Sequence, residues 1–167
     1  NGNMGHYTKV FGNTIIAGAY GWNTWRGAIY VYEKGEISGS SFAFKQRLTG
    51  TDTQPLSYLG LNIGMSNDFI IGGAPYSRPF GEYRSGSVYV YKKDEGGMWS
   101  QSQILIPYDS HAGGYFGYAV AIHKDTLVVG ARHTHNQVTG VRRAGKAYFY
   151  KSTQNGWEVA QELRSTR

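Results

Sequence analysis

Apolar and polar positions along this chain alternate in a way that predicts short strands. Nearly continuous apolar runs occur at 14–18, 69–73 and 126–130. Runs of about five mostly β-branched residues are typical of strands buried on both faces. No segment carries apolar residues at helical spacing for more than one turn. The pattern therefore favours an all-β fold.

Each apolar run is followed by two further strand-like segments. Segments 27–32, 86–91 and 145–150 alternate tyrosines with smaller apolar residues, and a period of two places the tyrosines on one face. Segments near 42–48, 99–105 and 157–163 mix polar and apolar residues, as an outer, half-solvated strand does. With the segment that precedes each run, such as 117–122, the pattern predicts four strands per unit.

The unit occurs three times, with four landmarks always in the same order. A first glycine is followed by a second thirteen positions later, then by a third glycine and an aromatic residue. The landmarks are Gly5, Gly60 and Gly117; Gly18, Gly73 and Gly130; Gly27, Gly86 and Gly145; and Phe42, Trp99 and Trp157. Four short strands with glycines where backbones approach are typical of propeller blades. We predict one β-propeller segment over 1–167, with four-stranded antiparallel blades at about 4–50, 57–107 and 114–165.

The landmarks resemble those of the FG-GAP repeat family. Phe116-Gly117 with Gly130-Ala131 is the closest copy, and Leu59-Gly60 and Met4-Gly5 open two more divergent ones. The resemblance implies blades like those of integrin α-chains, and an extracellular or cell-surface location. Many members hold calcium in the hairpin between the first two strands of a blade. Here those hairpins, 11–13, 66–68 and 123–125, each offer at most one carboxylate, so we expect a calcium-free form with no metal and no cofactor.

Charge and composition narrow the class of partner. The formal net charge is +6, which favours acidic proteins or acidic glycans as ligands. There is no cysteine, and no apolar stretch is long enough to span a membrane. We do not expect nucleic acid as the ligand.

Three blades are fewer than a closed ring requires. Propellers typically close with four to eight blades, so two sheet faces are left without a neighbouring blade. Exposed apolar faces of that kind indicate a partner surface. We expect further blades in the same protein, a second copy that closes the ring, or another protein stacked on these faces.

Candidate binding residues lie in the connections between the second and third strands of each blade. Aromatic rings and arginine forks in loops on a rigid scaffold form recognition surfaces for proteins, sugars and anions. The candidates are Trp22, Trp25, Arg26, Arg78, Phe80, Tyr83, Arg84, His133, His135, Arg142 and Arg143. His133 and His135 could also grip a transition metal, but no third ligand lies nearby in sequence.

No catalytic constellation is apparent in the chain. There is no nucleophile elbow, phosphate-binding loop or zinc-binding helix motif. We therefore expect a non-enzymatic binding or scaffolding module that recognises protein or glycan. Two alternatives are a lectin with sugar pockets between blades, and a structural subunit of a large surface or filament assembly. Loss of glycan binding on Trp22→Ala or Trp25→Ala would indicate the lectin, and a stable soluble monomer would exclude the assembly.

Overall fold

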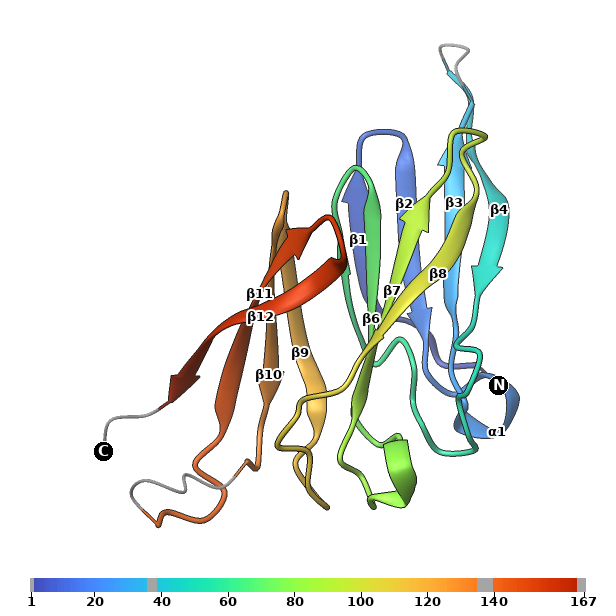
Figure 1. Ribbon diagram of the computed structural model, residues 1–167. Coiled ribbons are helices and arrows are strands. Elements are labelled where there is room, and N and C mark those ends of the chain that lie inside the picture. The colour runs from blue at the N-terminus through green and yellow to red at the C-terminus, as the bar shows by residue number, and fades with distance from the viewer. Residues whose placement is uncertain (1, 36–38, 135–139, 165–167) are drawn as a thin grey trace.

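The computed structural model describes residues 2–35, 39–134 and 140–164. The described strands form three separate four-stranded antiparallel sheets, which lie side by side (Figure 1). This confirms the predicted all-β fold, and the arrangement fits part of a propeller. The strands are β1 (Met4–Phe11), β2 (Thr14–Ala19), β3 (Ile29–Lys34), β4 (Phe42–Leu48), β5 (Asn62–Met65), β6 (Phe69–Ala74), β7 (Ser87–Lys93), β8 (Trp99–Leu105), β9 (Phe116–His123), β10 (Thr126–Ala131), β11 (Lys146–Thr153) and β12 (Gly156–Arg164).

Strand order within each sheet follows the order in the chain. The first sheet runs β1-β2-β3-β4, the second β5-β6-β7-β8 and the third β9-β10-β11-β12. Strand β5 contacts both β1 and β9, so the first strand of each sheet lies next to the first strand of its neighbour. All three sheets carry a register shift between the third and fourth strands. This shared irregularity shows that the sheets repeat each other in detail.

The apolar core lies in the two seams between neighbouring sheets. The first seam, between the first and second sheets, buries residues such as Ile29, Leu59 and Tyr89. The second seam, between the second and third sheets, buries Val88, Phe116 and Tyr148 in equivalent roles. The tyrosine faces of β7 and β11 therefore pack on the preceding sheet, because the tyrosines of these two strands are buried.

Two glycine landmarks set how closely the sheets approach. A Cβ atom built on Gly18 would lie far inside contact distance of the Gly60 carbonyl oxygen, and one built on Gly73 would meet the Gly117 carbonyl in the same way. Gly60 and Gly117 adopt φ of +84° and +85°, in the region that favours glycine. Across each seam, the second-landmark glycine of one sheet thus contacts the backbone of the first-landmark glycine of the next sheet.

Two short helical turns interrupt the connections between second and third strands. They are α1 (Trp22–Trp25) in the first sheet and η1 (Pro79–Gly81) in the second, and both contain residues with positive φ. Both turns lie at the lower edge of the molecule as drawn in Figure 1, opposite the hairpins between β1 and β2 and between β5 and β6.

Candidate binding face at the loop end of the sheets

The connections between second and third strands and the linkers between sheets share one end of the molecule, which we call the loop face. It comprises segments 20–28, 49–61, 75–86, 106–115 and the described parts of 132–145. The connections of the first and second sheets each run beside the linker that enters the next sheet. Tyr58 N donates to Trp25 O at 2.9 Å, and Tyr115 N donates to Arg84 O at 3.1 Å. The face is therefore fixed to the seams by backbone hydrogen bonds.

A continuous row of rings crosses the loop face from the first sheet to the third, and we call it the aromatic ladder. Tyr58 and Tyr76 have centroids 4.7 Å apart, and Tyr76 and Tyr115 are 5.2 Å apart. Such offset or edge-on pairs stabilise a fixed arrangement. The row consists of His6, Tyr20, Trp25, Tyr58, Tyr76, Tyr115 and His133. It passes over both seams without a break.

Arginine side chains lie over the rings of this face. The guanidinium carbons of Arg78 and Arg84 are both 4.7 Å from the centroid of Tyr83. Arg132 lies 4.3 Å from the ring of Tyr118 and 5.4 Å from that of Tyr115. A stacked guanidinium leaves the N–H groups at its edge directed away from the ring, where they can bind a ligand. The face therefore presents hydrogen-bond donors as well as hydrophobic surface.

Three of the predicted aromatic candidates are exposed on the loop face. Phe80 is 88% exposed, Tyr83 46% and Trp25 37%. Phe80 adopts φ of +55° and belongs to neither of the two core clusters. Trp22 is only half-buried, with the Arg47 guanidinium 4.4 Å from its ring. Phe80 therefore presents a hydrophobic side chain to solvent on the loop face.

The basic candidates divide into two groups. Arg26 donates from its side chain to the Thr53 carbonyl oxygen and so fastens the first linker. Of the other arginines in these connections, Arg78, Arg84, Arg132 and Arg142 make no ion pair with a carboxylate among the residues that the structure describes. Every Lys or Arg position in 20–27, 76–86 and 132–145 is an arginine, and Glu82 is the only acidic residue there. His135 lies outside the described residues.

The second seam opens onto the loop face as a basic hollow of about 590 Å³. Tyr83 and Tyr115 form one side, and His133, Arg142 and Arg143 come from the third sheet. Burial lowers the pKa of His133, and the positive charges of Arg132 and Arg143 lower it further. The structure thus brings together four of the predicted site residues: Tyr83, His133, Arg142 and Arg143.

The first seam opens onto the loop face as a less charged hollow of about 420 Å³. Trp22 and Arg26 lie on one side, and Thr49, Thr51 and Thr53 of the linker lie on the other. The two hollows therefore differ in their chemistry. Hydroxyl groups dominate the first, and guanidinium groups dominate the second.

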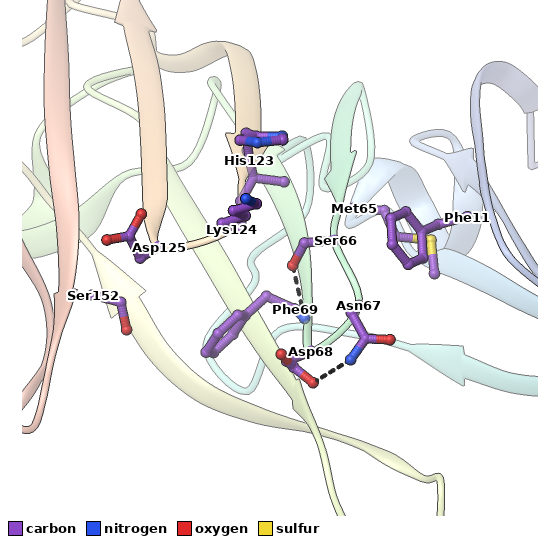
Figure 2. Close-up of a pocket in the computed structure, with 11 residues that line it drawn as sticks. Phe11, Met65, Ser66, Asn67, Asp68, Phe69, His123, Lys124, Asp125 and Ser152 are labelled. Carbon is purple, nitrogen blue, oxygen red and sulfur yellow. Dashed lines mark hydrogen bonds between the residues drawn. The ribbon is translucent and has the colours of Figure 1, made fainter.

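Another hollow, of about 510 Å³, lies at the opposite end of the strands, and Figure 2 shows its lining. Phe11, Met65 and Phe69 contribute apolar surface, and polar hairpin residues form the rim. Asn67 donates to the Asp68 carboxylate at 2.8 Å, and Phe69 N donates to Ser66 Oγ at 3.2 Å, so these polar groups are occupied locally. None of the predicted site residues lines this hollow.

The candidate list from the sequence omitted the middle of the aromatic ladder. Tyr58 and Tyr115 each stand two residues before a first-landmark glycine and adopt φ of +61° and +54°. A second shared position stands two residues before each third-landmark glycine, where Trp25, Arg84 and Arg143 all have positive φ. Position within the repeat was the signal that could have identified both sets.

Neither a metal cluster nor a spanning helix was found where the structure describes the chain. Over 2–35, 39–134 and 140–164, no three His, Cys, Asp or Glu side chains lie close enough together to hold a metal ion. Within the same ranges, no helix has the length and apolar character needed to cross a bilayer.

Comparison with known proteins identifies one repeat and a family of relatives. Residues 99–150, from β8 to β11, match the family described as FG-GAP repeat, which confirms the resemblance seen in the sequence. Integrin alpha-3 of Mus musculus is 26% identical over 129 residues, which is 72% of this chain and 11% of that protein. Integrin alpha-3 of Cricetulus griseus is 25% identical over 128 residues, with the same coverage. The chain thus spans roughly a tenth of the length of the curated relatives it matches.

Proposed function

We propose, from its FG-GAP repeat and its loop face, that this chain is a non-enzymatic binding module of an extracellular or cell-surface protein. We further propose that it recognises a protein ligand through the loop face. The location is supported by the resemblance to integrin alpha-3, since integrin α-chains are cell-surface proteins. The non-enzymatic character is supported by the FG-GAP match, since integrin-like FG-GAP proteins are generally non-enzymatic. The resemblance covers only a small part of those proteins, so their partners are not transferred.

The aromatic ladder is the observation that carries the choice of face. Seven rings from three sheets form one row, and arginines lie over several of its members or their neighbours. Rigid aromatic residues and arginines are the types that contribute most to protein interfaces. Phe80, 88% exposed, supplies a hydrophobic anchor in the same connection as Tyr76 of this row. At the opposite end of the strands, the hollow lined by Phe11, Met65 and Phe69 has polar groups that are paired locally.

The exposed side of the first sheet supports a further partner of a different kind. Tyr89 and Tyr148 are buried against the preceding sheet and donate to Asp52 and Asp109, each at 2.6 Å. Tyr30, at the same repeat position, is only half-buried. We propose that another blade, in the same protein or in a second copy, covers this surface. Analytical ultracentrifugation of the chain alone and with added flanking blades tests it, and a monomer whose Tyr30 stays accessible beside such blades contradicts it.

Binding to a panel of purified extracellular and cell-surface proteins tests the proposed function. Biolayer interferometry would compare the unmodified chain with Phe80→Ala and with Lys124→Ala, a control at the opposite end of the strands. We expect saturable binding to a panel member that weakens about tenfold or more in Phe80→Ala, as for a buried aromatic anchor, and is unchanged in Lys124→Ala. Binding that is lost in Lys124→Ala and retained in Phe80→Ala would contradict the choice of face.

A further inference from the structure

The rings that line the basic hollow are not open for stacking. Two guanidinium groups lie 4.7 Å from the ring of Tyr83, and one lies 5.4 Å from that of Tyr115. Sugar rings bind aromatic residues through the same faces that these arginines cover. The hollow therefore offers guanidinium edges rather than bare aromatic faces to a ligand.

The charge of Arg142 in the hollow is not balanced by a carboxylate among the residues that the structure describes. Among the described residues, the six ion pairs involve Glu33, Asp109, Asp125 and Glu162, and none of them includes Arg84, Arg132 or Arg142. All four carboxylates bond to residues of the strands, and Asp109, in the linker 106–115, bonds to Lys146 and Tyr148 of β11. Concentrated positive charge in a partly enclosed hollow attracts anions.

We propose that the basic hollow at the second seam binds carboxylates of an acidic segment in a partner protein. This inference rests on the proposed function and adds the chemical class of the ligand. Guanidinium forks match the planar geometry of carboxylates and can bind them through two parallel hydrogen bonds. The covered ring faces favour acidic side chains over an acidic sugar, which would lose its stacking partners. The use of arginine at every basic position of these connections agrees with recognition by forks rather than by general positive charge.

The position of the hollow also fits a ligand that crosses from sheet to sheet. Tyr83 belongs to the second sheet, while Arg142 and Arg143 belong to the third, and the linker residue Gly113 is held between them by a 2.8 Å hydrogen bond to Tyr83 O. Exposed Phe80 belongs to the same connection as Tyr83. An acidic segment with a neighbouring apolar residue could therefore contact both the hollow and Phe80.

The test uses a fluorescein-labelled hexaglutamate peptide and measures its binding to the chain by fluorescence anisotropy. We expect saturable binding that weakens at higher salt, because exposed charges are screened. Arg142→Gln with Arg143→Gln should weaken it about tenfold or more, and Arg142→Lys with Arg143→Lys about threefold, because lysine keeps the charge but loses the fork. Lys92→Gln, which removes one exposed charge from the far end of β7, should leave it unchanged. Circular dichroism confirms that each variant is folded.

Three results would overturn the inference. One is no saturable binding of hexaglutamate at low salt. Another is an equal loss in Lys92→Gln and in the double glutamine variant, which would indicate net charge alone. The last is tighter binding of a hyaluronan oligosaccharide with the same number of carboxylates than of the peptide, together with weaker binding of that oligosaccharide to the double glutamine variant. That outcome would assign the hollow to an acidic glycan.

Failure of this inference is distinguishable from failure of the proposed function. A panel protein that requires Phe80 while hexaglutamate does not bind would overturn the acidic ligand and leave the loop face intact. The opposite pattern would overturn the proposed function instead. In that pattern, hexaglutamate binding requires the two arginines, but binding of the panel protein is unchanged when the two arginines or Phe80 are substituted.

Discussion

The two seams between neighbouring sheets share their packing contacts but differ in charge. In each, a glycine pair brings two backbones together, a tyrosine donates to a linker aspartate, and a glutamine holds the next outer strand. The first seam places Ser87 directly after the third-landmark glycine, where the second seam places Lys146. Ser87 accepts one hydrogen bond from Ser77 at 2.8 Å, whereas Lys146 is buried and pairs with Asp109 and Glu162. The repeated contacts explain stability, and the departures carry the distinctive chemistry.

Breaking a shared backbone contact should have the largest effect. Gly73→Ala places a Cβ against the Gly117 carbonyl, where neither backbone can yield without separating the sheets. We expect a loss of about 3 kcal/mol in the free energy of unfolding, at the upper end for overpacking. Gly130→Ala is the matched control, because there the added Cβ would meet only Ala119 Cβ at 3.4 Å. Urea denaturation measures both, and equal losses would show that the close approach does not matter.

Removing the charge that distinguishes the second seam should have the next largest effect. Lys146→Ser leaves Asp109 and Glu162 without their buried cation. Breaking a buried pair in this way should lower the free energy of unfolding by about 3 kcal/mol or somewhat less, because both carboxylates keep tyrosine partners. Lys151→Ser removes an exposed pair with Asp125 and should cost about 1 kcal/mol at most. The same denaturation experiment compares them, and a similar cost for both would contradict the structural importance of Lys146.

Removing the glutamine contacts should affect the two seams equally. Gln46 bonds to the backbone N and O of Trp99 at 3.0 and 2.7 Å, and Gln103 does the same to Trp157 at 2.8 and 3.1 Å. Gln46→Ala and Gln103→Ala should each cost about 1–2 kcal/mol for the two lost bonds. Gln161→Ala, at the same position in the third sheet, is an exposed control. Clearly unequal losses in the first two variants would show that the seams are not equivalent.

Acid should destabilise the second seam through Glu162, and we expect this effect on stability to be the smallest of the four. Burial alone raises the pKa of Glu162, but hydrogen bonds from Tyr108, Arg164 and Lys146 outweigh it and lower the pKa to about 2. Because the folded-state value lies below the ordinary one, the stabilisation is present at neutral pH and is lost as the pH falls from about 4.5 towards 2. Glu162→Gln should flatten this part of the curve of thermal midpoint against pH. Glu158→Gln, exposed on the same strand, should leave the curve unchanged, and a curve unaltered by both contradicts the assignment.

The fold could be predicted from the sequence because each landmark satisfies a local packing requirement. Gly18 and Gly73 must be small, since a neighbouring carbonyl occupies the place of a side chain. The candidate site could be predicted only as a set of loops. The contact between Tyr58 and Tyr76 joins the first linker to the connection of the second sheet, and that between Tyr115 and His133 joins the second linker to the connection of the third sheet. Their geometry follows from how the sheets pack, which no single segment determines. The assignment of the eleven candidate residues to ligand binding stays a prediction.

The shared position before the third-landmark glycine has a practical consequence for protein engineering. The backbone adopts nearly the same φ there, +63°, +53° and +56°, whether the residue is Trp25, Arg84 or Arg143. An aromatic residue and two cations are thus accepted by one backbone conformation. A combinatorial library randomised at these three positions would vary the outer surface while the seams beneath stay constant. The chain could then serve as a display scaffold whose specificity is selected without redesign of its core.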